Sequence, residues 1–165
     1  MGIEPAFALA EHLEDAVASH GFRRFTPGGG GLPWISAWKR KTWNTNRGIA
    51  LLAVPPGAPH AGEYALDVRV PAGKAIGYLP FLYELGLQLV LCGPGILERS
   101  DGLERCVTKL NNSTVLLQSL HLVDPATGAS RSVRTWGQVV TGPFIDAIEA
   151  GIARFRNSRV QSNAP

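Results

Sequence analysis

The chain has 165 residues, of which 45% are hydrophobic and 18% charged, and its formal net charge is +3. This length and composition predict one globular domain with a sizeable core and argue against intrinsic disorder. The 19 glycines and 12 prolines follow no fixed period, which argues against collagen-like and repeat architectures.

The cysteines and the apolar stretches limit the cellular setting. Cys92 and Cys106 lack metal-site spacing, so we expect buried thiols in a reducing cytoplasm, with no disulfide framework, metal or cofactor. Acidic residues interrupt what would be a secretory signal near the N-terminus. Residues 75–97 are apolar, but glycines and prolines divide them and Glu84 lies among them, so no membrane span is expected.

The first half predicts a helix and then a hairpin. Leu9, Leu13 and Val17 have helical spacing within residues 6–20, and Gly21 is a suitable left-handed stop. The Gly28–Gly31 run lacks the Gly-Lys-Ser/Thr ending of a phosphate loop and predicts a plain loop. Strands are expected over Trp34–Trp43 and Gly48–Val54, joined by a turn at residues 44–46.

The middle of the chain is more ambiguous. Alternating apolar residues at 64–70 favour a strand, a helix remains the alternative, and Pro71 is expected to end either one. A short helix is expected over Leu79–Leu85, followed by a buried strand over Leu87–Cys92.

The second half predicts another strand pair and a last helix. Strands over Ser113–Val123 and Arg131–Val140 flank a turn at residues 124–128. Pro143 is expected at the first position of the final helix. The buried stripe of that helix is then Phe144, Ile148, Ile152 and Phe155.

These elements predict an α+β domain with a mostly antiparallel sheet, and with helices at the N-terminus, middle and C-terminus packed on one face. The domain is expected to cover residues 1–159, followed by a frayed polar tail at 160–165. The order of elements is similar in outline to that of small secretion-chaperone-like domains, and this resemblance assigns no residue a role.

The positive charge is localised. Residues 21–60 contain six basic residues and no acidic one, so the rest of the chain has a net charge of −3. Strand alternation puts Trp34, Trp38 and Arg40 on one face of the hairpin, and Lys39, Lys41 and Trp43 on the other. The candidate partner-binding residues are Trp38, Lys39, Arg40, Lys41, Trp43, Asn46 and Arg47.

Three explanations fit this basic hairpin. Its cations protect a sheet edge from aggregation while the tryptophans pack inward, or cations and aromatic rings bind nucleic acid, or tryptophan and arginine form a protein contact.

No set of residues predicts catalysis. A restriction-nuclease-like core would need carboxylates on its central strands, and only Asp67 with Arg69 distantly imitates that pattern. Ser119 and His121 point the same way from one strand, without the independent placement of a triad with Asp124. We therefore expect a non-catalytic protein-binding, adaptor or chaperone-like domain that acts through protein contacts, either with a protein partner or by self-association as a homo-oligomer. The alternatives are a nucleic-acid-binding module using hairpin 34–54, or an enzyme site assembled from scattered residues such as Asp67, Glu84, His121 or Asp124.

Overall fold

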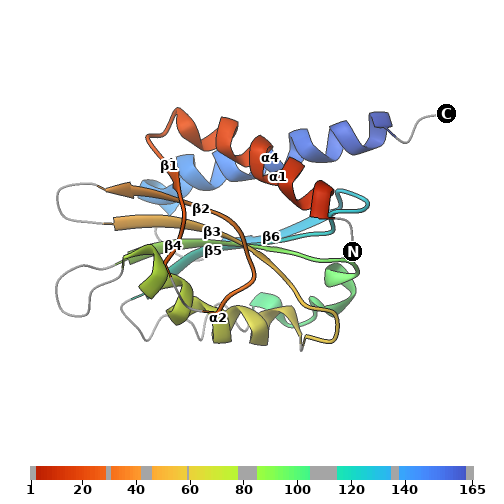
Figure 1. Ribbon diagram of the computed structural model, residues 1–165, viewed down its shortest axis with the longest axis horizontal. Helices are drawn as coiled ribbons and strands as arrows, with labels where there is room; N and C mark the ends of the chain where they lie inside the picture. The colour runs from red at the N-terminus through yellow and green to blue at the C-terminus, as the bar shows by residue number, and fades with distance from the viewer. Residues whose placement is uncertain are drawn as a thin grey trace.

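The structure is a computed structural model, and it describes residues 3–28, 31–41, 46–58, 60–77, 85–104, 115–134 and 138–162. Within these residues a six-stranded sheet lies between two helical layers (Figure 1). The strands are β1 (Arg23–Phe25), β2 (Trp34–Lys41), β3 (Asn46–Ala53), β4 (Leu85–Cys92), β5 (Val115–Val123) and β6 (Ser130–Arg134). The helices are α1 (Ile3–Ala18), α2 (Ala61–Ile76), the short 3₁₀ helix η1 (Ile96–Arg99) and α4 (Gln138–Ser162).

The strands are ordered in space as they are in the chain, from β1 to β6. Three of the five pairings between these described strands are antiparallel, and β4 is parallel to both β3 and β5. The structure therefore confirms an α+β domain with a mostly antiparallel sheet.

The expectation that all helices pack on one face is wrong. In Figure 1, α1 and α4 cover one face and α2 covers the other. The physical reason lies in the central strands: all eight residues of β4 are buried, so both faces of the sheet need a cover. The parallel pairing of β3 with β4 uses α2 as its crossover helix.

The two faces hold separate clusters of buried side chains. Ile49, Leu51 and Val90 pack beneath α1 and α4, whereas Leu52 and Leu89 pack against α2. Because neighbouring residues on one strand point to opposite faces, a continuous apolar run such as that of β3 supplies both cores.

Residues 64–70 are helical, so the favoured strand is wrong and the alternative is correct. The fully buried positions Ala61, Ala65, Val68 and Ala72 recur at helical spacing, while the alternating residues Tyr64 and Leu66 are only half-buried. Pro71 lies inside α2 and does not end it. The burial of this small-residue stripe decides the conformation, against the strand propensity of the larger side chains.

The end of the chain also differs from expectation. The strand predicted to reach Val140 ends at Arg134, and α4 begins at Gln138, so Pro143 lies inside the helix. Thr141 and Phe144 are buried, and this packing overrides the strand preference of the β-branched residues before Pro143. α4 continues to Ser162, three residues into the segment expected to fray.

The other elements agree with the sequence. The N-terminal helix, the β2–β3 hairpin and the buried strand β4 are present, and Gly21 has a positive φ of 80° as expected for a left-handed stop. The predicted helix over Leu79–Leu85 lies outside the described residues, except that Leu85 begins β4.

Candidate functional site

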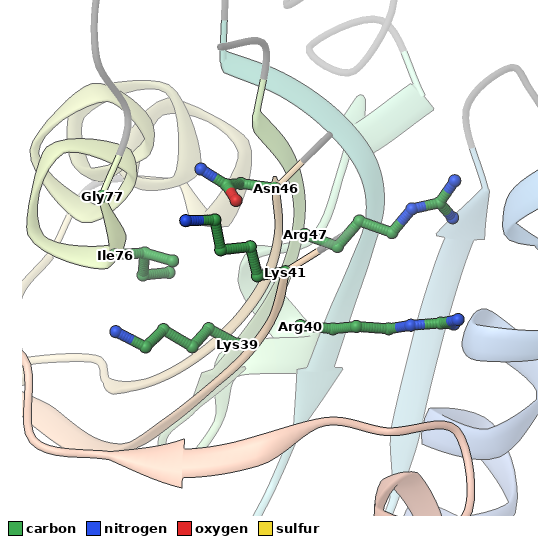
Figure 2. A pocket seen from close by; sticks show the side chains of 7 residues that line it. All are labelled: Lys39, Arg40, Lys41, Asn46, Arg47, Ile76 and Gly77. Carbon is green, nitrogen blue, oxygen red and sulfur yellow. The ribbon is translucent and has the colours of Figure 1, made fainter. Parts of the chain in front are cut away.

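The basic residues gather where β2 ends and β3 begins. Lys39 pairs with Gly48, Arg40 with Arg47, and Lys41 with Asn46. Opposite residues of an antiparallel pair share a face, and the side chains alternate along each strand. Lys39 and Lys41 therefore project toward the α2 side, while Arg40 and Arg47 project toward α4, as Figure 2 shows. We call these four residues together with Asn46 the basic end of the hairpin.

The lysine side of the basic end borders a surface depression of about 260 Å³. Ile76 and Gly77, at the C-terminal end of α2, form its opposite wall. Lys39 Nζ lies 4.6 Å from the centre of the Phe25 ring, and both lysines are exposed. Cations next to a helix C-terminus are favourably placed because the last carbonyl groups carry partial negative charge. The lining residues are Lys39, Arg40, Lys41, Asn46, Arg47, Ile76 and Gly77.

The arginine side of the basic end packs on α4. The guanidinium carbons of Arg40 and Arg47 lie 5.1 Å and 4.7 Å from the centre of the Phe144 ring. Arg47 also donates a hydrogen bond of 3.4 Å to the carbonyl oxygen of Val140. Partial burial lowers the pKa of Arg47, and the neighbouring positive charge of Arg40 lowers it further. Both arginines still carry their charge, since an arginine remains protonated in proteins.

No carboxylate neutralises the basic end within the described residues. The salt bridges found there join Arg24 to Glu14, Arg131 to Glu104, and Arg134 to Asp146 and Glu149. Lys39, Arg40, Lys41 and Arg47 take part in none of them. Among the described residues, the basic end is thus a concentration of positive charge without an ion-pair partner at one end of the sheet.

The structure separates the seven predicted partner-binding residues. Five of them form the basic end of the hairpin. Trp38 is fully buried beneath α1 and α4, so its ring is not available to a partner, contrary to the expectation. Trp43 lies outside the described residues.

A bulge explains the position of the two described hairpin tryptophans. The register of β2 against β3 shifts between Trp34 and Ser36. Trp34 therefore packs against the α2 core and Trp38 against the α1–α4 core, although simple alternation predicts one shared face. A bulge inserts one residue and reverses the facing of the strand that follows it.

The histidine considered for catalysis is part of a buried hydrogen-bond network. His121 is fully buried, its Nε2 lies 2.8 Å from Ser119 Oγ, and its Nδ1 lies 2.8 Å from Ser132 Oγ. Burial lowers the pKa of His121 to about 3, and the charge of Arg134 contributes. A neutral imidazole with a hydroxyl at each nitrogen is satisfied in either tautomer, so the network is structural.

The other catalytic candidates do not join His121. Asp124 accepts hydrogen bonds from the backbone N–H groups of Gly95, Ala126 and Thr127, which fixes the turn before β6. Asp67 is exposed on α2, and Glu84 lies outside the described residues.

Sequence reasoning missed the second role of Phe144. Its burial in the helix stripe was expected and is confirmed, but its contacts with Arg40 and Arg47 join segments about 100 residues apart in the chain. No local pattern carries that signal. The hydrogen bond of 2.7 Å between the side chains of Gln88 and Gln118 was missed for the same reason.

Other chemistry is sparse in the part of the chain that the structure describes. There, no three His, Cys, Asp or Glu side chains are grouped closely enough to hold a metal ion. Cys92 is a buried free thiol, as expected, and burial raises its pKa to about 12; Cys106 is outside the described residues. None of the described helices combines the length and the apolar character needed to cross a membrane.

Comparisons of the chain with protein-family models, with curated protein sequences and with solved structures give no match.

Proposed function

We propose that this chain is a non-catalytic binding domain whose basic hairpin end docks an acidic segment of a partner protein. One observation carries the proposal: four cations stand at the end of two adjacent strands without a carboxylate from the described residues to neutralise them. Like charges held together destabilise a folded domain, so such an arrangement is typical of a surface that binds an anion.

Two features favour acidic side chains over nucleic acid as the anion. The cationic side chains project from two sides of the hairpin, the lysines toward α2 and the arginines toward α4 (Figure 2). They therefore do not form one continuous track for a phosphate backbone. Of the described aromatic rings near them, Trp38 is fully buried, Phe144 is 9% exposed, and the half-buried Phe25 has the Lys39 ammonium group over its ring. Single-stranded nucleic acid is stabilised by bases that stack on open rings, and these three rings leave little open surface for stacking.

Binding of a fluorescently labelled glutamate-rich peptide, followed by anisotropy at low and at moderate salt, tests the proposal. We expect the wild type to bind and its affinity to fall as salt rises, because exposed charges are screened. Charge reversal at Lys39→Glu with Lys41→Glu should weaken binding by about tenfold or more. Arg156→Glu is the matched control, because Arg156 is exposed on α4 outside the basic end and its reversal should change the affinity by less than about twofold.

The absence of peptide binding at low salt, or binding that is unchanged by the lysine reversal, would contradict the proposal. Single-stranded RNA and DNA of matched charge form a second arm of the experiment. Tighter binding of either nucleic acid than of the peptide would favour the nucleic-acid alternative instead.

The proposal includes a cytoplasmic location. The acidic segment belongs either to another protein or to a second copy of this chain, and the oligomeric state distinguishes the two. Light scattering of the purified chain shows whether a second copy supplies the segment, since the residues outside 21–60 have a net charge of −3. A dimer that dissociates on lysine reversal would identify the partner as the chain itself.

A further inference from the structure

Two arginines from adjacent strands converge on one aromatic ring. Arg40 and Arg47 are directly paired across the β2–β3 ladder, and both guanidinium groups lie within about 5 Å of the centre of the Phe144 ring. The same ring contacts Phe22 and His20 edge-on, at centroid distances of 5.5 Å and 5.7 Å. Phe144 is therefore fixed from several sides, and it holds the two arginine side chains at a defined place.

Another arginine that contacts α4, Arg134, is paired with carboxylates. On α4, Asp146 and Glu149 both accept hydrogen bonds of 2.6 Å from the guanidinium group of Arg134. That pairing raises the pKa of Arg134, whereas burial and the charge of Arg40 lower the pKa of Arg47. Nearer the start of α4, both Arg40 and Arg47 contact the Phe144 ring, and Arg47 also donates a hydrogen bond to the carbonyl oxygen of Val140. Neither arginine is paired with a carboxylate of the described residues.

We propose that Arg40 and Arg47, supported by Phe144, form a site for one dianionic phosphate monoester, such as a phosphorylated side chain of the acidic partner. This inference rests on the proposed function and specifies what the arginine side of the hairpin recognises.

The charge and the shape of the two side chains favour this ligand. Two guanidinium groups supply two positive charges, which one phosphate dianion balances and one carboxylate does not. Each guanidinium group is planar with a fork of donors that matches the oxygens of phosphate, and stacking on an aromatic ring presets its orientation. The lysines on the other side carry compact charges on flexible stems, which suit ordinary carboxylates.

The test compares three peptides of one sequence that carry serine, glutamate or phosphoserine at the central position. Their binding to the wild type is measured by calorimetry. We expect the phosphoserine peptide to bind about tenfold or more tightly than the glutamate peptide. Arg40→Gln with Arg47→Gln should remove this preference, while Lys39→Gln with Lys41→Gln should keep it. Inorganic phosphate as a competitor distinguishes a site for free phosphate from one that needs the peptide.

A second variant keeps the inference testable if the double arginine variant does not fold. Arg47→Lys keeps the charge and loses the fork, so we expect it to lower phosphoserine-peptide binding by about fivefold and glutamate-peptide binding by a smaller factor. Equal affinity of the wild type for the phosphoserine and glutamate peptides would overturn the inference. If glutamate-rich peptides still bind through the lysines in that case, the proposed function stands without it. If no anionic peptide binds, both fall.

Discussion

The imidazole of His121 lies with its Nε2 2.8 Å from the hydroxyl oxygen of Ser119, two residues earlier on the same strand. Its other nitrogen, Nδ1, lies 2.8 Å from the hydroxyl of Ser132 on β6, so a neutral ring joins the last two strands beneath α4. Protonation would make both nitrogens donors inside the protein and add a charge near Arg134.

We predict that His121 makes the domain less stable in mild acid. Its pKa is about 3 in the folded chain, against about 6.5 for an unperturbed histidine, so the unfolded chain binds the proton more tightly. The stability contribution is therefore complete above pH 6.5 and is lost as the pH falls from there toward 3. The expected loss is about 1.4 kcal/mol per pH unit below 6.5.

Urea unfolding at pH 7.5 and pH 5.5 measures this effect, with His121→Gln as the variant that lacks the titrating group. The difference between wild type and variant should shrink at the lower pH. An unchanged difference would show that His121 is not buried as a neutral ring.

Replacement of Gly48 by alanine should loosen the contact between the sheet and α2. A Cβ atom at residue 48 would lie 2.7 Å from Cγ2 of Ile76, closer than side chains tolerate. We expect Gly48→Ala to destabilise the domain by about 1–3 kcal/mol through overpacking. In thermal or urea unfolding, the double variant with Ile76→Ala should lose less stability than the two single losses combined, because the smaller side chain removes the clash. Additive losses would contradict the contact.

Trp38 should matter for stability and not for binding. Its side chain is fully buried, and its indole N–H has no hydrogen-bond partner among the described residues. Trp38→Ala should cost about 3–5 kcal/mol in urea unfolding. Trp38→Phe keeps most of the apolar contact and removes the unpaired donor, so it should fold and bind the glutamate-rich peptide like the wild type. Loss of binding in a folded Trp38→Phe domain would mean that the partner contacts this ring.

The sequence predicts the local elements well, because helix stripes, turn residues and apolar runs are short-range signals. Gly21, the turn at Asp124 and the buried strand β4 are examples. It predicts the two-sided placement of the helices poorly, since no short pattern shows that β3 and β4 are parallel and that α2 crosses between them.

The candidate site shows the same division. The cluster of cations is a local feature and is read directly from residues 39–47. The burial of Trp38 depends on the bulge at Trp34, and the ring beneath the arginines comes from Phe144, far along the chain. Strand alternation alone predicts neither, because both depend on tertiary packing.

Pro71 provides a last test of how α2 is stabilised. A proline inside a helix lacks the N–H that would bond to the carbonyl four residues before it, and its ring crowds that carbonyl, at a cost of about 3 kcal/mol. Proline also restricts the unfolded chain, which stabilises the folded state by about 0.4–1 kcal/mol and offsets part of this cost. We therefore expect Pro71→Ala to raise the free energy of unfolding by about 1–2 kcal/mol, since residue 71 is only half-buried and loses little packing.

Urea unfolding measures the gain, with helix content followed by circular dichroism. Pro71→Gly is the control, because glycine restores the N–H but is a poor helix former, so its gain should be smaller by about 1 kcal/mol. A loss of stability in Pro71→Ala would mean that the proline ring packs in α2 more tightly than its exposure indicates.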